Sequence, residues 1–385
     1  MIFPERTVVE IWNPENGTVT LPENMYGQGK YICDFAPGEM KLYRAVHVGK
    51  NRQSFGETAD FAGAKAAPVR KVRKVILEEA LSYELSEPNV CVLDRVSVHI
   101  PEYVCKKEEV LRADTELREI LGFPAKDGEM LQPWYQKKYR PEQSGKKQDV
   151  ELVYEFEIQD MPKNIALAVE QGNSSLKILI NGQCISSQAE GFWVDSCFHK
   201  IPIPNDVLKK GVNEIRIQDK IDIYHGIEAV FLLGKFAVEI NKDHTPVLKK
   251  LPETIVFGNL CQQGFPFYSG KIRYLIPEMQ GKICRVTLQK PKAWAMRLIG
   301  DTQANVSWAP YQGIVKNLSS IELILTRKNI FGPLHQSKAD PPLCGPESFR
   351  TTGADWSDSY VLQVQGLMER PEIVEVIYEN EKRDA

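Results

Sequence analysis

Apolar and polar side chains alternate along much of the chain, and this alternation predicts β-strands. Between Val150 and Ile158 nearly every second residue is apolar, and three glutamates occupy the opposite face. The same period of two returns in the segments 90–100, 213–217 and 320–325. Strands with one apolar and one polar face build antiparallel sheets, usually as sandwiches or barrels. The pattern therefore predicts an all-β fold.

The turn signals fit this prediction. The apolar run 176–180 leads into Asn181-Gly182, and Asn-Gly is typical of a type I′ hairpin turn because both central residues need a positive φ. Gly211 starts a second sharp turn before the strand at 214–217. One helix is predicted within Lys106–Leu121, where apolar residues recur at helical spacing. Because this segment is short and rich in charge, we expect the helix at the surface.

Two polar stretches, 50–67 and 135–148, have the composition of connections. The segments 177–214 and 295–321 share an order of strand, tight turn, tryptophan and closing strand, which suggests two copies of one sandwich plan. We therefore expect four regions: the remnant of a β-sandwich domain at 1–60, a connecting region with strands and one short helix at 61–148, a jelly-roll β-sandwich at 149–245, and a second jelly-roll β-sandwich with C-terminal strands at 246–385.

The charge and the cysteines narrow the class of protein. Lys plus Arg number 48 and Asp plus Glu 51, for a net charge of −3, whereas nucleic-acid and membrane-surface binders usually carry a basic excess. No apolar run reaches the roughly 18 residues of a membrane span. The first ten residues lack the layout of a signal peptide, and the eight cysteines are dispersed without a C-x-x-C pair. We therefore expect a cytoplasmic protein without a cofactor and identify no metal ligands. A structural Ca²⁺ ion stays open, although no Asp-rich loop matches a calcium motif.

Three short motifs then occur that belong to a known pattern. Ile178–Gly182 is a strand ending in Asn-Gly, Leu208–Asn213 ends in Gly-x-Asn, and Trp308–Tyr311 reads Trp-x-Pro-Tyr. They resemble elements of the non-catalytic C-terminal β-domains of glycoside hydrolases, of the α-L-rhamnosidase type and the β-galactosidase-like group. Those domains are galactose-binding-like jelly rolls, so the resemblance implies two such sandwiches here.

Further segments resemble the same family over nearly the whole chain. They are Ile11–Gly17, Ala36–Glu39, Gly264–Gly270, Asn329–His335, Gly345–Phe349 and Tyr360–Leu362. The sequence departs from the family at Ile299-Gly300-Asp301, where Val-Asn-Gly is usual, and at Gln336, where a second histidine is usual.

The resemblance begins where the family's catalytic barrel ends, and no series of alternating strands and helices predicts a (β/α)₈ barrel here. It implies an accessory module set of a glycoside hydrolase. Such a set binds carbohydrate and packs on the catalytic barrel domain of the parent enzyme, which is absent from this chain.

Sugar-binding sites combine aromatic faces with a few hydrogen-bonding groups. The candidate carbohydrate-binding residues are Trp193 and Asp195 in the first sandwich and Trp308 and Tyr311 in the second. Packing in a core or between domains is the alternative role for both tryptophans.

The sequence identifies no catalytic residues. Glycoside hydrolysis needs two carboxyl groups about 5 or 6.5–9.5 Å apart, and most acidic residues here fall on solvent-facing strand positions, where nothing raises a pKa. Asp94 interrupts an apolar strand and is expected to be structural, as is His335. Asp94, Asp195 and Asp301 are the least implausible carboxylates for a hidden site. We expect no glycoside hydrolysis by this chain alone. Two alternatives stay open: a complete glycoside hydrolase with an unrecognised site, and a free-standing carbohydrate-binding protein.

Overall fold

The computed structural model describes residues 7–12, 19–20, 25–26, 30–31, 33, 35, 40–47, 69–124, 138, 147–170, 176–277, 279–338, 345 and 348–378. Strands hold 46% of the residues and helices 9%, and antiparallel pairing dominates the sheets. The predicted all-β class is therefore confirmed. Two motifs of the sequence fall largely outside the described residues: most of Ile11–Gly17 and all of Ala36–Glu39.

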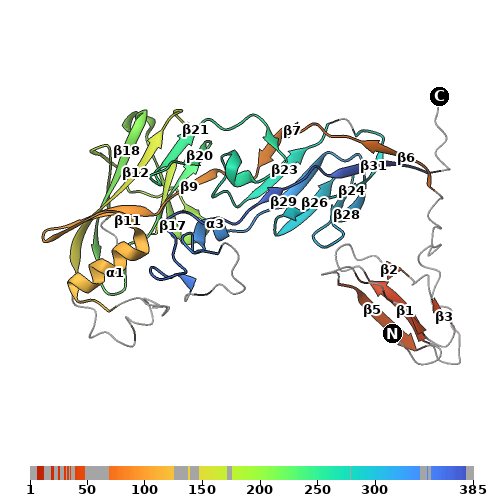
Figure 1. Cartoon of the computed structure of the whole chain (residues 1–385), viewed down its shortest axis with the longest axis horizontal. Helices are drawn as coiled ribbons and strands as arrows, with labels where there is room; N and C mark the ends of the chain where they lie inside the picture. Colours follow the sequence, from red (N-terminus) through yellow and green to blue (C-terminus); the bar gives the residue numbers. More distant parts are fainter. Residues whose placement is uncertain are drawn as a thin grey trace.

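The first sandwich consists of two sheets (Figure 1). Six strands of the larger sheet follow the order β11(Tyr103–Glu109), β10(Arg95–Ile100), β12(Gln148–Ile158), β18(Gly211–Ile221), β14(Lys177–Ile180) and β15(Gln183–Ile185). This sheet is extended at β12 by β21(Pro246–Lys249), which pairs with β20(Ala237–Ile240). The smaller sheet has the order β16(Phe192–Trp193), β17(Asp195–Pro202), β13(Ala166–Glu170), β19(Val230–Gly234) and β9(Asn89–Leu93).

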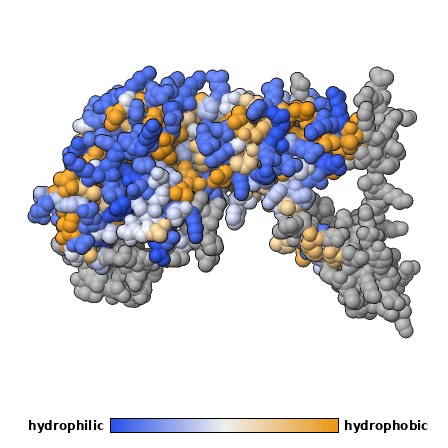
Figure 2. Space-filling view, viewed as in Figure 1, coloured by the Kyte–Doolittle hydropathy of each residue, from blue (hydrophilic) through white to orange (hydrophobic). Residues whose placement is uncertain are grey.

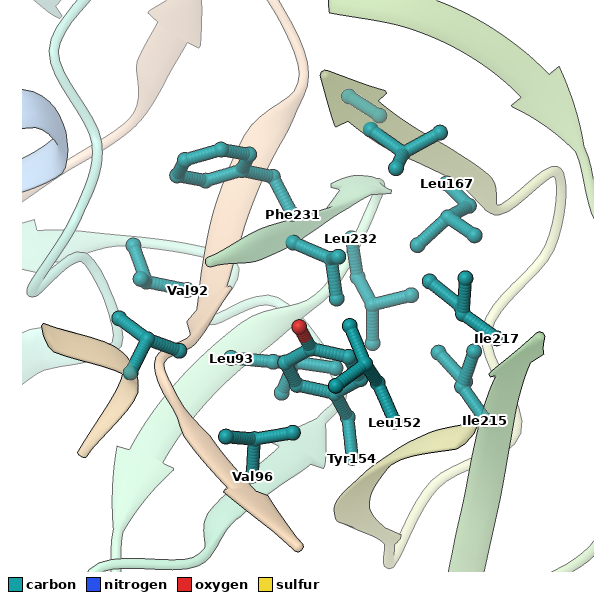
Figure 3. Close-up of a cluster of buried hydrophobic side chains, with 14 of the residues drawn as sticks. Val92, Leu93, Val96, Leu152, Tyr154, Leu167, Ile215, Ile217, Phe231 and Leu232 are labelled. Atoms are coloured by element: carbon teal, nitrogen blue, oxygen red, sulfur yellow. The ribbon is translucent and has the colours of Figure 1, made fainter. Parts of the chain in front are cut away.

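The apolar faces of these two sheets share one interior. Figure 3 shows Leu152 and Tyr154 of β12 among side chains of the smaller sheet, including Leu232 of β19. Along β12 the glutamates are exposed or half-buried, as the alternation predicts. Each buried aliphatic or aromatic side chain contributes roughly 1.5–3 kcal/mol, so this interior is the main source of the sandwich's stability.

The hairpin between β14 and β15 has the predicted turn. Asn181 and Gly182 both have a positive φ, of 51° and 82°, and Ile180 pairs with Gln183 across the turn. The Asn181 side-chain amide also donates to the Val207 carbonyl at 2.8 Å. The turn is thus fixed by its own backbone geometry and by a neighbouring loop.

The second sandwich repeats the plan with shorter strands. Its five-stranded sheet has the order β27(Gln303–Asn305), β26(Ala295–Ile299), β29(Ser320–Ile324), β23(Lys271–Leu275) and β8(Tyr83–Leu85). Its four-stranded sheet has the order β28(Gln312–Lys316), β24(Ile283–Thr287), β31(Glu372–Tyr378) and β6(Val69–Val75). Two short pairs complete it, β22(Ile255–Val256) with β7(Ala80–Leu81) and β25(Pro291–Lys292) with β30(Gly366–Leu367).

The region 61–148, expected as a connection, contributes strands to both sandwiches. Its strands β6, β7 and β8 pair with strands of the second sandwich. The next strands along the chain, β9 to β11, belong to the first sandwich. The second sandwich is therefore built from strands that precede the first sandwich along the chain and from strands that follow it.

The helix α1(Val110–Leu121) begins four residues later than the start of the predicted segment, because β11 runs to Glu109. The Glu109 carboxylate caps it by accepting from the backbone N–H of Leu111 and Arg112, and Gly122 ends it with φ 66°. The helix is more than a surface element, since a face with Val110 and Leu117 is buried in the first core.

A long excursion links the two sandwiches in addition to the chain connections from β8 to β9 and from β21 to β22. We call the described residues of 326–338, 345 and 348–365 the return segment; it starts after β29, contacts the first sandwich and ends before β30. Its α3(Lys328–Phe331) and Leu334 pack into the first core. Its two arms run antiparallel, with Val361 N–H donating to the Leu334 carbonyl and Ser357 N–H to the His335 carbonyl, each at 2.8 Å.

The remaining described strands lie near the N-terminus and form two small sheets. They are β1(Thr7–Trp12) with β2(Val19–Thr20) and β5(Leu42–His47), and β3(Met25–Tyr26) with β4(Lys30–Tyr31).

In Figure 2 hydrophilic residues cover most of the visible sandwich surface, with apolar residues in small patches. Within the described ranges, no helix has both the length and the apolar character needed to cross a bilayer.

Candidate functional site

A cavity of about 160 Å³ lies where the return segment meets the first sandwich. Its walls are mainly apolar and aromatic, and include Phe198, Phe231, Phe331, Phe349 and Trp356. Its polar lining residues are Asp94, Glu109, Glu228, His335, Gln336 and Arg350. An apolar pocket with a few convergent polar groups is the usual form of a ligand site.

Asp94 stands at the corner between β9 and β10 and binds two residues of the return segment. Its Oδ2 lies 3.1 Å from His335 Nε2, and its Oδ1 accepts a short hydrogen bond from the Tyr360 hydroxyl. Its backbone carbonyl accepts from Val110 N–H at 2.8 Å, at the start of α1. A single residue therefore ties together the sheet, the helix and the return segment.

His335 faces an acceptor on each side of its ring. Nδ1 lies 2.9 Å from the Ser357 carbonyl oxygen, and Nε2 faces the Asp94 carboxylate. Only a doubly protonated imidazole donates from both nitrogens. Burial by itself lowers the pKa of His335, but the hydrogen bond and the charge of Asp94 outweigh it, so this pKa lies above its ordinary 6.5. We conclude that Asp94 and His335 form a buried ion pair.

Tyr360 completes this group as a neutral donor. Burial raises the pKa of its hydroxyl well above 10, and the charge of Asp94 raises it further. Its ring lies 4.8 Å from that of His335, and the His335 ring is stacked on Trp356 at 5.2 Å. The imidazole is thus held in place by two aromatic side chains.

Glu109 lines the cavity from the N-terminus of α1 and is only 4% exposed. Burial raises the pKa of its carboxyl from 4.5 to about 7, and the charge of Asp94 adds to this effect. The two backbone N–H groups that it caps oppose the rise. A carboxyl group with this pKa is partly protonated at neutral pH, so it can act both as donor and as acceptor.

A network of charges lies around Trp356. Its indole N–H donates to Asp358 Oδ1 at 3.1 Å, and the Arg112 guanidinium lies 5.2 Å from the centre of its ring. Arg112 also lies 3.5 Å from Asp358. These contacts attach the outer arm of the return segment to α1.

The wall at Glu228 and Ala229 is positioned by a buried pair on α1. Arg118 Nε donates to Asp114 Oδ2 at 2.7 Å, and both side chains are almost fully buried. The Arg118 guanidinium also donates to the backbone carbonyls of Ile223 and His225, each at 3.3 Å. The loop ahead of β19 is therefore fixed to the helix.

Of the expected sugar-binding residues, Trp193 and Asp195 lie next to the turn between β16 and β17. Trp193 is buried, and its ring contacts Phe198, Phe231 and Phe331 at 5.1–5.9 Å. These three phenylalanines line the cavity, so Trp193 supports its aromatic wall. Asp195 is exposed and accepts from Cys197 N–H at 3.0 Å.

Trp308 and Tyr311 belong to the second sandwich, so the structure does not join the four predicted residues into one site. Both are half-buried, and Tyr311 N–H donates to the Trp308 carbonyl at 2.7 Å within one turn. Asp301 is exposed in the same sandwich and accepts from the Asn317 amide at 2.9 Å. Neither tryptophan lines the cavity at Asp94.

Asp94 and His335 were each expected to be structural, and the structure brings them together. Glu109 and Tyr360 are site residues that sequence reasoning missed. The expectation that nothing raises a pKa concerned carboxylates on solvent-facing strand positions. Glu109 is not one of them, because strand pairing and α1 bury it beside Asp94, and its pKa is raised. Its signal in the sequence is weak: an acidic residue directly before a helix is also what an exposed cap looks like.

The described cysteines are all free. Across the parts of the chain that the structure describes, no group of three His, Cys, Asp or Glu side chains is arranged to hold a metal ion.

No protein-family model matches the chain, and no curated protein matches its sequence. Several solved structures match part of it. An FMN-binding β-glucuronidase from Faecalibacterium prausnitzii is 11% identical with a TM-score of 0.25, over 63% of this chain and 34% of its own. A β-D-mannosidase from Dictyoglomus thermophilum is 12% identical with a TM-score of 0.23, over 67% of this chain and 31% of its own.

An α-L-rhamnosidase from Streptomyces avermitilis, in complex with L-rhamnose, is 8% identical with a TM-score of 0.23, over 78% of this chain and 28% of its own. The chain thus spans about a third of the length of these structures. They are glycoside hydrolases by description, but TM-scores of this size establish neither a common fold nor a common function.

Proposed function

We propose that this chain is a carbohydrate-binding β-sandwich protein and that its ligand site is the cavity at Asp94, Glu109 and His335. The observation that carries the proposal is the lining of this cavity: aromatic and aliphatic walls around deeply buried polar groups. A sugar ring has the matching character, with apolar C–H faces and hydroxyl groups at its edge. The order of family-like motifs in the sequence gives independent support.

We further propose that the chain is an accessory part of a glycoside hydrolase, packing on a catalytic barrel domain. The support is the resemblance of the motifs, which match only non-catalytic domains. The reading frame upstream of Met1 tests this role. A barrel-coding sequence joined in frame supports it, and a stop codon there favours the free-standing carbohydrate-binding protein.

The binding proposal is tested by titrating a panel of monosaccharides and oligosaccharides into the chain by calorimetry. Leu111 lines the cavity from the first turn of α1, so Leu111→Trp fills the space. Thr115, one turn further along, is exposed and outside the cavity, so Thr115→Trp is the matched control. We expect weak binding, roughly in the micromolar to millimolar range, that Leu111→Trp abolishes and Thr115→Trp keeps. Binding that survives Leu111→Trp overturns the cavity as the site.

Glycoside hydrolysis in the same cavity is a second candidate function. It is favoured by one observation: Glu109, a carboxyl group with a pKa of about 7, and the Asp94 carboxyl group line the same cavity. An acid of this kind and an opposed carboxylate are the two groups that hydrolysis needs. Both Asp94 oxygens are already engaged by His335 and Tyr360, which makes binding the preferred proposal.

Aryl glycosides, rhamnosides included, distinguish the two functions. Turnover that persists through repurification and is lost in both Asp94→Asn and Glu109→Gln establishes hydrolysis. Absence of turnover in a chain that binds sugars leaves binding as the function.

A further inference from the structure

Glu109 commits one carboxylate oxygen to the protein and leaves the other available. Its Oε2 accepts from Leu111 N–H at 3.0 Å and from Arg112 N–H at 3.1 Å. No described residue donates a hydrogen bond to Oε1, and no described lysine or arginine forms an ion pair with this side chain. Among the described residues, the fully buried side-chain atoms without a hydrogen-bond partner are Arg95 Nε and Trp193 Nε1, and Oε1 is not one of them. This oxygen is therefore reached from the cavity that Glu109 lines and can accept from a ligand there.

The charges around the cavity leave Glu109 without compensation. Asp94 and His335 form an ion pair and cancel. At the rim, exposed Glu228 and Arg350 have opposite signs. Outside the wall, Glu108 lies 3.9 Å from Arg95 and 3.7 Å from Arg112, and Asp358 lies 3.5 Å from Arg112, so two carboxylates match these two arginines. The interior therefore has an excess of one negative charge when Glu109 is ionised.

We propose that the cavity binds a ligand with a primary ammonium group, which donates to Oε1 of Glu109, and that its preferred carbohydrates are amino sugars with a free amine. The second half of this inference rests on the proposed function, that the cavity binds carbohydrate. An ammonium group supplies three donors and a compact positive charge, which is what Oε1 and the uncompensated charge require. An N-acetylated sugar lacks the charge, and a uronic acid has the wrong sign.

The titration of Glu109 fits this inference. Burial and the Asp94 charge raise its pKa to about 7, and an ammonium beside it favours the ionised form. Binding near pH 7 is then accompanied by release of a proton from Glu109. The groups that face Glu109 and shape this titration are Asp94 at the β9–β10 corner, His335 and Arg350 of the return segment, Glu228 of the loop before β19, and Glu108 and Arg112 at the start of α1.

The test measures dissociation constants at pH 7 by calorimetry, in two buffers of different ionisation enthalpy so that proton release is counted. The probes are D-glucosamine, D-glucose, N-acetyl-D-glucosamine, D-glucuronic acid and cyclohexylammonium. We expect D-glucosamine to bind at least tenfold more tightly than D-glucose, with proton release. Glu109→Gln should abolish both the preference and the release. The control is Glu119→Gln, which removes an exposed carboxylate near the end of α1, outside the cavity, and should keep both.

Each outcome separates the inference from the function. Equal binding of D-glucosamine and D-glucose overturns the ammonium site and leaves carbohydrate binding. Binding of cyclohexylammonium without any sugar supports the ammonium site and overturns carbohydrate binding. Absence of binding by every probe overturns both.

A second measurement covers the case in which Glu109→Gln fails to fold. Cyclohexylammonium stays charged between pH 5 and pH 8, while Glu109 ionises within this range. Its affinity for the unaltered chain should rise severalfold from pH 5 to pH 8, and His335→Gln should keep a rise, since Glu109 still ionises. A flat profile in both chains contradicts the assignment to Glu109.

Discussion

Asp94 and His335 lie 241 positions apart in the sequence, yet Asp94 Oδ2 and His335 Nε2 are 3.1 Å apart and both side chains are 4% exposed. The pair joins the first sandwich to the return segment at the wall of the cavity. A buried ion pair is often no better than well-packed apolar residues, but removing one partner leaves an uncompensated charge. The cavity therefore depends on both members being present.

Asp94→Asn is expected to destabilise the first sandwich by about 3–5 kcal/mol, the usual cost of breaking a buried pair. The substitution keeps the size of the side chain but leaves the imidazolium of His335 without its counter-ion. Denaturant unfolding at pH 7 measures the loss. Asp301→Asn, at an exposed carboxylate of the second sandwich, is the control and should change stability by less than about 1 kcal/mol. Equal effects of the two substitutions would contradict the ion pair.

The charge of His335 makes stability depend on pH. Its pKa in the folded chain lies above the ordinary 6.5 because of Asp94, despite the opposing effect of burial. The stabilisation from its charged form is therefore complete below about pH 6.5 and is lost as the pH rises through the raised folded-state value. The difference in unfolding free energy between the unaltered chain and His335→Gln should be largest near pH 6 and shrink towards pH 9. A difference that stays constant would mean that folding leaves the pKa of His335 unshifted, and one that grows with pH would mean that His335 is neutral in the folded chain.

Glu109 gives a second pH dependence, at lower pH. Since burial and Asp94 raise its pKa from 4.5 to about 7, the folded chain holds this proton more tightly than the unfolded chain. Stability should fall as the pH rises from about 4.5 to 7, by about 3 kcal/mol at roughly 1.4 kcal/mol for each pH unit. In Glu109→Gln the capping oxygen remains but this part of the slope should vanish. Parallel pH profiles for the two chains would mean that Glu109 titrates normally.

Breaking the buried pair of Asp114 and Arg118 is expected to destabilise the protein strongly, although neither residue lines the cavity. Arg118→Met should cost about 3–5 kcal/mol, because it leaves the Asp114 carboxylate buried and the carbonyls of Ile223 and His225 without their donor. Arg118→Lys keeps the charge without the planar fork and should cost less. Thermal unfolding measures both. Arg285→Met, at an exposed arginine of the second sandwich, should have a small effect.

Substitutions at Trp193 distinguish a packing role of this residue from direct contact with sugar. Its indole N–H has no hydrogen-bond partner, so Trp193→Phe loses no hydrogen bond and should be mildly destabilising. Trp193→Ala should cost about 3–5 kcal/mol, as for other buried aromatic residues, and should weaken binding because the phenylalanine wall collapses. Trp308→Ala, at a half-buried position, should cost less. Circular dichroism melts measure the stabilities. Full stability of Trp193→Ala would contradict the packing role.

The local features of this fold could be predicted because they depend on near neighbours. The alternation around Val150–Ile158 reflects a strand with one solvent-exposed and one buried face. The turn at Asn181-Gly182 reflects the preference of these two residues for a positive φ. The helix was found by its spacing, but its burial was not. Its charged residues suggest a wet surface, whereas Asp114 and Arg118 satisfy each other inside the protein.

The candidate site could be predicted only in fragments. Asp94 stood out as a polar residue within an apolar strand, and a buried carboxylate requires a partner. No residue near Asp94 in the sequence identifies His335 as its partner, because His335 belongs to the distant return segment. Glu109 follows two lysines and a glutamate, so its surroundings suggest exposure. Its burial is a product of tertiary packing.

The sequence also does not show that the strands of the region 61–148 are shared between the two sandwiches, because this depends on tertiary packing. A run of strands separated by short turns is consistent with one sheet or two. The choice depends on pairing partners, and for β6 the partner is β31 near the end of the described chain.

This pairing also orders events while the protein is being synthesised. The strands of the first sandwich, β9 to β21, leave the ribosome consecutively, but β6 has to wait until β31 has emerged. At roughly 5–20 residues per second this delay lasts roughly 15–60 s, during which a bare strand edge could recruit other chains. Charged side chains, lysine above all, discourage edge-to-edge aggregation. The sequence of β6 includes four basic residues, Arg70, Lys71, Arg73 and Lys74, which lower this risk while β6 is unpaired. Because His335 and Tyr360 are translated late as well, the cavity at Asp94 is completed only after the strands of the first sandwich have emerged.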